Sequence, residues 1–217
     1  MRIVAICGID GSGKTTVARS LLKRLEDDGL VATYGYGRYA PPKTSLVSRL
    51  FRKLSFGKED AEGFPEAYAP HRQAFMSSVI VRCCFLGLML PGYIVQLRRI
   101  LRESRGTEVL VLDRYVLDTW ALDARLGRET SPQNDLSLLR LLSKLMPPAT
   151  HSFLLDVDEK VARTRRGDNL PSPLLGQAIE DYRVGAAFLA IRRLDGSQPT
   201  EASCLDILST LDATRFR

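Results

Sequence analysis

The stretch that decides the fold is Gly8-Ile9-Asp10-Gly11-Ser12-Gly13-Lys14-Thr15-Thr16. Its first eight residues match the pattern G-x-x-x-x-G-K-[ST] at every fixed position. A short β-branched apolar run at 2–7 precedes it and predicts a buried strand, while helical spacing of apolar residues over 14–28 follows it. Glycines in such a loop let backbone N–H groups surround phosphate oxygens, and the helix N-terminus adds partial positive charge. The stretch therefore predicts a phosphate-binding loop between a parallel strand and a helix.

The side chains of this loop suggest individual roles. Lys14 is expected to reach the β- and γ-phosphates of a nucleotide, and the Thr15 hydroxyl is expected to hold Mg²⁺. The remaining loop positions expected to bind the nucleotide are Gly8, Gly11, Ser12, Gly13 and Thr16. The pattern thus predicts ATP and magnesium as ligands.

A second group of interest, Asp113-Arg114-Tyr115, follows the apolar run 108–112, which predicts another buried strand. In an open α/β sheet the carboxyl ends of the strands face the ligand crevice, so Asp113 is expected near Lys14 and Thr15. There it would hold the magnesium ion or accept a proton, and Arg114 would present a guanidinium to a phosphate. An Asp–Arg pair that caps the next helix is the structural alternative.

The rest of the chain alternates strand and helix patterns. Further strands are predicted at 31–36, 152–156 and 191–195, and helices at 45–54, 72–105 (with a bend at Pro91-Gly92), 117–126, 136–145, 159–165, 174–190 and from 200 onward. Loops are predicted at 35–42, overlapping the end of the second strand, and at 56–70. This order predicts an α/β protein in three layers, with a five-stranded parallel sheet flanked by helices. We expect one domain over 1–217, with a small lid at about 163–173.

Composition narrows the classes of protein. The 217 residues are 45% hydrophobic and 26% charged, which excludes a disordered or collagen-like chain. Lys and Arg number 31 against 25 Asp and Glu, a net charge of +6 that suits an anionic partner. Four cysteines without a disulfide or zinc spacing predict free thiols in a reducing cytoplasm.

Neither a membrane nor a nucleic acid is an expected partner. No signal peptide is visible, and the apolar segment 79–95 is interrupted by Arg82, Pro91 and Gly92, which favours a buried helix. Trp120 is expected in the core. A basic helix face without interleaved aromatic residues is expected to be solvated surface, and it comprises Arg98, Arg99, Arg102 and Arg105.

Taken together, these motifs resemble the thymidylate kinase family of nucleoside monophosphate kinases. The resemblance rests on the phosphate loop with its Asp10, on Asp113-Arg114-Tyr115, and on three later segments, Leu155-Asp156-Val157, Arg163-Thr164-Arg165-Arg166-Gly167-Asp168 and Leu194-Asp195-Gly196-Ser197-Gln198. It implies the fold of P-loop NTP hydrolases with an arginine-rich lid. It also implies transfer of a phosphoryl group from ATP to dTMP with Mg²⁺, and a homodimer formed through the long central helices.

The resemblance also implies roles for single residues. Asp10 would contact the sugar 3′-hydroxyl of the acceptor, while Arg38 and Arg114 would grip the acceptor phosphate beside Tyr115. Some family members carry an arginine at the loop position that is Gly11 here. The catalytic cations would therefore come from the lid, as Arg163, Arg165 and Arg166.

The residues that read the acceptor base depart from the family. Arg82 is the candidate for base recognition, but Ser78 stands one turn before it, where an aromatic residue is expected. Phe75 lies on the same face two turns away and is the substitute we predict.

Two further positions also depart from the family pattern. The Ala-Tyr-Gln of many members reads Ala121-Leu122-Asp123 here, and a carboxylate at Asp123 accepts hydrogen bonds only. Ala186 stands where a tyrosine is expected. The acceptor therefore has two open alternatives to dTMP: the hydroxyl of a nucleoside, sugar or small metabolite, or no acceptor at all in a nucleotide-binding regulator.

Overall fold

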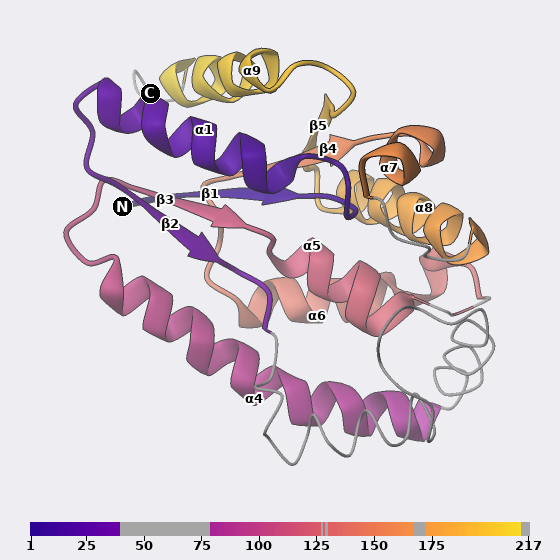
Figure 1. The fold of residues 1–217 in the computed structure, drawn as a ribbon. Helices are drawn as coiled ribbons and strands as arrows, with labels where there is room; N and C mark the ends of the chain where they lie inside the picture. Colours follow the sequence, from indigo (N-terminus) through magenta and orange to yellow (C-terminus); the bar gives the residue numbers. More distant parts are fainter. Residues whose placement is uncertain (40–78, 127, 129, 167–171, 214–217) are drawn as a thin grey trace.

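The computed structural model describes residues 1–39, 79–126, 128, 130–166 and 172–213 (Figure 1). Within these ranges, the side chains of 79–86, 166, 172, 173, 212 and 213 lie outside the description. The predicted helix at 45–54, the predicted loop at 56–70 and Phe75 are also outside it.

The centre of the fold is a sheet of five parallel strands in the order β2-β3-β1-β4-β5. The strands are β1 (Arg2–Cys7), β2 (Ala32–Tyr36), β3 (Val109–Asp113), β4 (His151–Asp156) and β5 (Arg192–Asp195). All five predicted strands are confirmed to within two residues at either end. Ile6 and Tyr36 both pair in register with Asp113. The carboxyl ends of β1, β2 and β3 therefore meet at one edge of the sheet.

Helices cover both faces of the sheet, as predicted (Figure 1). One face packs against α1 (Lys14–Asp27) and α9 (Thr200–Ala213). The other packs against α4 (Val79–Glu103), α5 (Val116–Asp118), η1 (Thr119–Arg125), α6 (Leu136–Leu145) and α8 (Ser172–Phe188). The short η2 (Pro132–Asp135) precedes α6, and α7 (Glu159–Arg166) follows β4.

Two predicted helices differ in detail. The described part of the long helix predicted at 72–105 is α4, and this helix continues through Pro91. The helix predicted at 117–126 is a single α-turn, α5, that passes into the π-helix η1. A π-helix is wider than an α-helix and often occurs at functional sites. Side chains along Thr119–Arg125 are therefore spaced around the helix axis differently from those of an α-helix.

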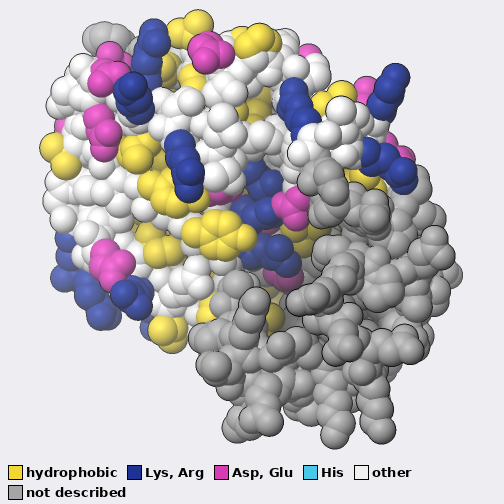
Figure 2. All heavy atoms as spheres, viewed as in Figure 1, with side chains coloured by type: hydrophobic (Ala, Val, Ile, Leu, Met, Phe, Trp, Pro, Cys, Tyr) yellow, Lys and Arg dark blue, Asp and Glu magenta, His cyan; other side chains and the backbone are white. Residues whose placement is uncertain are grey.

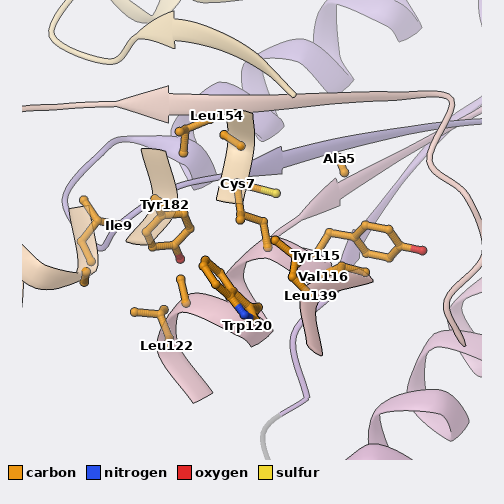
Figure 3. Close-up of a cluster of buried hydrophobic side chains, with 14 of the residues drawn as sticks. Ala5, Cys7, Ile9, Tyr115, Val116, Trp120, Leu122, Leu139, Leu154 and Tyr182 are labelled. Carbon is orange, nitrogen blue, oxygen red and sulfur yellow. The ribbon is translucent and has the colours of Figure 1, made fainter. Parts of the chain in front are cut away.

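The core beneath the sheet confirms the prediction for Trp120, which is fully buried among Cys7, Leu139 and Tyr182 (Figure 3). Its indole N–H donates to the Asp135 carbonyl at 3.1 Å, so its polar atom is satisfied. Cys7 and Cys204 are buried free thiols, as predicted, while the side chains of Cys83 and Cys84 lie outside the described residues.

The predicted exposure of the basic helix face is confirmed. The basic face formed by Arg98, Arg99, Arg102 and Arg105 is exposed, and Figure 2 shows Lys and Arg side chains gathered over the carboxyl end of α4. Arg99 forms an i,i+4 ion pair with Glu103. In the described ranges, no helix combines the length and the apolarity that crossing a bilayer requires.

A buried charge network joins η1, η2 and α8. Arg125 donates from Nε to Asp181 at 2.8 Å and also pairs with Asp135, and only 1% of the Arg125 and Asp181 side chains is exposed. The pKa of Asp181 is raised to about 6. Burial is the largest cause, Arg125 opposes the shift, and the nearby Asp135 adds to it. The folded protein therefore holds a proton at Asp181 more tightly than the unfolded chain does.

This raised pKa predicts a pH-dependent stability. The contribution of Asp181 is fully present below about pH 4 and is lost as the pH rises through about 6. We expect Asp181→Asn to gain stability relative to the wild type between about pH 4 and pH 7, by up to about 3 kcal/mol. Urea unfolding at both pH values measures this difference. Asp206→Asn, which neutralises an exposed carboxylate on α9, should show no such trend. A pH-independent difference for Asp181→Asn would contradict the prediction.

Candidate active site

The phosphate loop lies where the sequence places it, between β1 and the start of α1. Gly13 caps α1 with φ 88°, a left-handed conformation that glycine adopts without strain. Ser12 is buried, and its hydroxyl has no hydrogen-bond partner within the described residues. Thr15 and Thr16 are exposed in the first turn of α1. The N-terminus of the 14-residue helix α1 and the side chain of Thr15 therefore lie together at the end of the loop.

Lys14 lies inside this loop. Its ammonium group donates to the Ile9 carbonyl at 2.9 Å and to Asp10 Oδ1 at 3.3 Å, and only 3% of the residue is exposed. Burial lowers the pKa of Lys14, the nearby Arg114 lowers it further, and Asp10 opposes both. A buried ammonium held at the mouth of an anion-binding loop favours phosphate oxygens as further partners.

Asp113, at the end of β3, meets Thr15 as predicted. The Thr15 hydroxyl donates to Asp113 Oδ2 at 2.6 Å, and the Tyr34 hydroxyl donates to the same oxygen at 3.0 Å. Asp113 is 1% exposed, and its Oδ1 has no hydrogen-bond partner among the described residues. A buried carboxylate oxygen beside a threonine hydroxyl is the ligand set that magnesium takes together with phosphate oxygens. The residues present therefore fit Mg²⁺.

Tyr34 was not predicted from the sequence. It lies on β2, where it pairs in register with Val111 of β3, and its hydroxyl reaches Asp113 two residues further along β3. Burial raises the pKa of Tyr34 to about 12, and Asp113 contributes to the shift. Tyr34 therefore keeps its hydroxyl proton and donates it to Asp113 Oδ2. The other oxygen, Oδ1, is the one without a partner among the described residues.

Arg114 lies at the centre of the site. Its backbone has φ 71°, a left-handed conformation that costs a residue other than glycine about 1 kcal/mol or more. Its guanidinium pairs with Asp10, lies 3.5 Å from Asp118 Oδ1 and sits over the ring of Tyr36 at 6.0 Å. The chain passes so close here that a Cβ on Gly37 would collide with the Arg114 carbonyl.

Asp118 is the second residue that sequence reasoning missed. It is fully buried in α5 and accepts hydrogen bonds from the Tyr115 backbone N–H at 3.0 Å and the Tyr182 hydroxyl at 2.7 Å. The N–H of Gly8 also points at it, at 3.4 Å. The spacing of four residues between Arg114 and Asp118 was the available signal, although the pair does not share a helix face, because Arg114 precedes α5.

Arg38 and Asp123 were predicted separately, and the structure brings them together. Arg38 donates to Asp123 from Nε at 3.1 Å and from Nη2 at 2.5 Å, which is a bidentate ion pair between the end of β2 and η1. The side chains are 27% and 15% exposed. Figure 2 shows basic and acidic side chains together in a hollow beside the grey residues.

Arg163 and Arg165, two of the arginines predicted in the lid, have different surroundings. Arg165 donates to the Gly196 carbonyl at 2.6 Å, and a Cβ on Gly13 would lie 3.9 Å from its Nη1, so it borders the phosphate loop. Arg163 instead forms a half-exposed ion pair with Glu159 on its own helix. The side chains of Arg166 and Arg82 lie outside the described residues.

Tyr115 also stands apart from the other predicted site residues. Its ring is buried in the core, and its hydroxyl donates to the Pro147 carbonyl. Figure 3 shows the ring pointing away from Ile9 of the phosphate loop. Ala186, the position expected to be a tyrosine, is buried on α8, one turn after Tyr182. The described site therefore consists of Asp10, Lys14, Thr15, Tyr34, Arg38, Asp113, Arg114, Asp118, Asp123, Arg165 and Tyr182.

Neither the models of known protein families nor the curated protein sequences contain a match to this chain.

Proposed function

We propose that the protein is a phosphotransferase with the fold of P-loop NTP hydrolases. It would move the γ-phosphoryl group of ATP to a nucleoside monophosphate, with dTMP as the acceptor that the family resemblance names. The observation that carries the proposal is the meeting of Lys14, Thr15 and Asp113 at one sheet edge, with Asp113 Oδ1 unpartnered among the described residues. Arg114 adds a guanidinium at the end of the same strand.

On the donor side, the loop N–H groups and Lys14 would hold the β- and γ-phosphates. Thr15 and Asp113 would hold Mg²⁺, which supplies charge neutralisation at the phosphates when bound. Arg165 already borders Gly13 and would neutralise charge that develops on the transferring group.

On the acceptor side, Arg114 would orient the acceptor phosphate in line with the γ-phosphorus. An oxygen of that phosphate forms the new P–O bond, and the bond between the γ-phosphorus and the β–γ bridging oxygen breaks, so that ADP leaves with the bridging oxygen. Little covalent chemistry falls to the protein in such a transfer, so positioning and electrostatics account for the rate.

A coupled assay of ADP release tests the proposal. The wild-type protein with ATP and Mg²⁺ is given dTMP, dUMP, dCMP, dAMP or dGMP, with an acceptor-free reaction as the blank. We expect turnover above the blank with at least one monophosphate. The proposal fails if ATP is bound and none of them is phosphorylated.

A second candidate keeps the same donor site but uses the hydroxyl of a nucleoside, sugar or small metabolite as the acceptor. The observation that favours it is the Arg38–Asp123 pair, because two donor positions of Arg38 are already occupied by a carboxylate. Thymidine, deoxycytidine and a set of sugars in the same assay distinguish it. Turnover of these, with none of the monophosphates, would select this candidate.

A further inference from the structure

The buried carboxylate of Asp118 has no role in the chemistry described above. It is fully buried, and every contact that the structure gives it within the described residues comes from a donor. These donors are the Gly8 and Tyr115 backbone N–H groups, the Tyr182 hydroxyl and the Arg114 guanidinium. The Cys7 thiol also faces it, and after burial Asp118 is the next cause that raises the pKa of Cys7.

These contacts come from three separate parts of the fold. Gly8 begins the phosphate loop, Arg114 and Tyr115 follow β3, and Tyr182 lies on α8. A buried carboxylate that accepts hydrogen bonds from several donors holds those donors in one arrangement. Moving any donor away would leave the charge without that hydrogen bond in an apolar interior, which is costly. Asp118 therefore connects the start of the loop to the arginine beside it.

Arg114 needs such a connection. Its left-handed backbone is not the conformation that an arginine adopts by itself, and its long side chain has many rotamers. Asp118 lies on one side of the guanidinium at Nη1, and Asp10 pairs with it at Nη2. The two carboxylates together define the plane of the guanidinium.

We propose that Asp118 is a positioning residue that fixes Arg114 for the acceptor phosphate, with Tyr182 holding Asp118 in turn. This inference rests on the proposed function, because it assigns Arg114 to the acceptor. A carboxylate at this point also offsets the repulsion between Arg114 and the nearby Lys14, whose pKa is lowered first by burial and then by Arg114. Acceptor affinity therefore depends on a residue that the acceptor does not touch.

The test compares Asp118→Asn and Tyr182→Phe with the wild type in steady-state kinetics, using whichever of dTMP, dUMP, dCMP, dAMP and dGMP the wild type phosphorylates. Loss of a charge-assisted contact in Asp118→Asn should lower kcat/KM for the acceptor by about 10- to 100-fold. Tyr182→Phe removes one neutral donor and should lower it by about three- to tenfold. The KM for ATP should change by less than about threefold in both, since Lys14 keeps its contacts with the Ile9 carbonyl and Asp10.

Asp181→Asn is the matched control. Asp181 is the neighbour of Tyr182 on α8, is equally buried and also pairs with an arginine, but it belongs to the Arg125 network. It should change stability without changing the acceptor constants. Should Asp118→Asn fail to fold, Tyr182→Phe decides the question by its ratio of acceptor to ATP effects.

The outcomes separate the two claims. Turnover by the wild type with unchanged acceptor constants in both variants, or equal losses for acceptor and ATP, contradicts the positioning role alone. Absence of turnover by the wild type with every monophosphate contradicts the proposed function itself.

Discussion

Replacing Lys14 with alanine is expected to lower kcat for phosphoryl transfer by roughly 10²- to 10³-fold, the usual effect of removing one preorganised donor from a developing charge. The ammonium is buried and held by the Ile9 carbonyl and Asp10, so its position is fixed before any phosphate arrives. A solvent molecule in its place would have to reorganise during the reaction. The KM for ATP should rise as well, because the same group binds the ground state.

Initial rates at saturating ATP and acceptor measure this effect. Lys23→Ala is the control, because Lys23 is an exposed lysine on the same helix. It should leave both constants at wild-type values. A Lys14→Ala protein that keeps more than about a third of wild-type kcat would rule out the assigned role.

The second large effect is expected for Asp113→Asn. The asparagine keeps the size of the side chain but removes the charge, and its amide nitrogen would face hydroxyl donors or the metal. We expect kcat/KM to fall by roughly 10²- to 10³-fold and the magnesium concentration for half-maximal rate to rise. The unpartnered Oδ1 is the atom whose loss causes this.

A magnesium titration of the initial rate measures the change, and Mn²⁺ binding followed by electron paramagnetic resonance in the presence of ATP gives a readout that does not need turnover. Asp135→Asn removes another buried carboxylate from an arginine pair and serves as the control. An unchanged magnesium requirement in Asp113→Asn would place the metal elsewhere.

The sequence was sufficient to predict that Lys14, Thr15 and Asp113 come together. The loop pattern specifies Lys14 and Thr15 by spacing, and the rule that parallel strands end at a common edge brings Asp113 to them across 98 residues of chain. Neither inference needs side-chain packing. Strand and helix positions were predictable for the same reason, since apolar periodicity depends on local order alone.

The contacts of Arg38, Asp123 and Tyr34 could not be predicted in the same way. The Arg38–Asp123 pair spans 85 residues and depends on the width of η1, and apolar spacing does not distinguish a π-helix from an α-helix. Tyr34 required the knowledge that β2 lies beside β3, which follows from sheet order and not from strand pattern. Such contacts depend on how elements dock, where single-sequence rules carry little information.

The adjacency of Asp181 and Tyr182 on α8 limits how this part of the chain can vary in length. One residue faces the Arg125 network and the next faces Asp118, so both depend on the same helical register. Inserting or deleting one residue between Leu174 and Asp181 would turn both side chains by about 100° and remove them from their partners together. The exposed Glu180 on the same helix can be exchanged freely by comparison. This segment should therefore accept changes of composition but not of length.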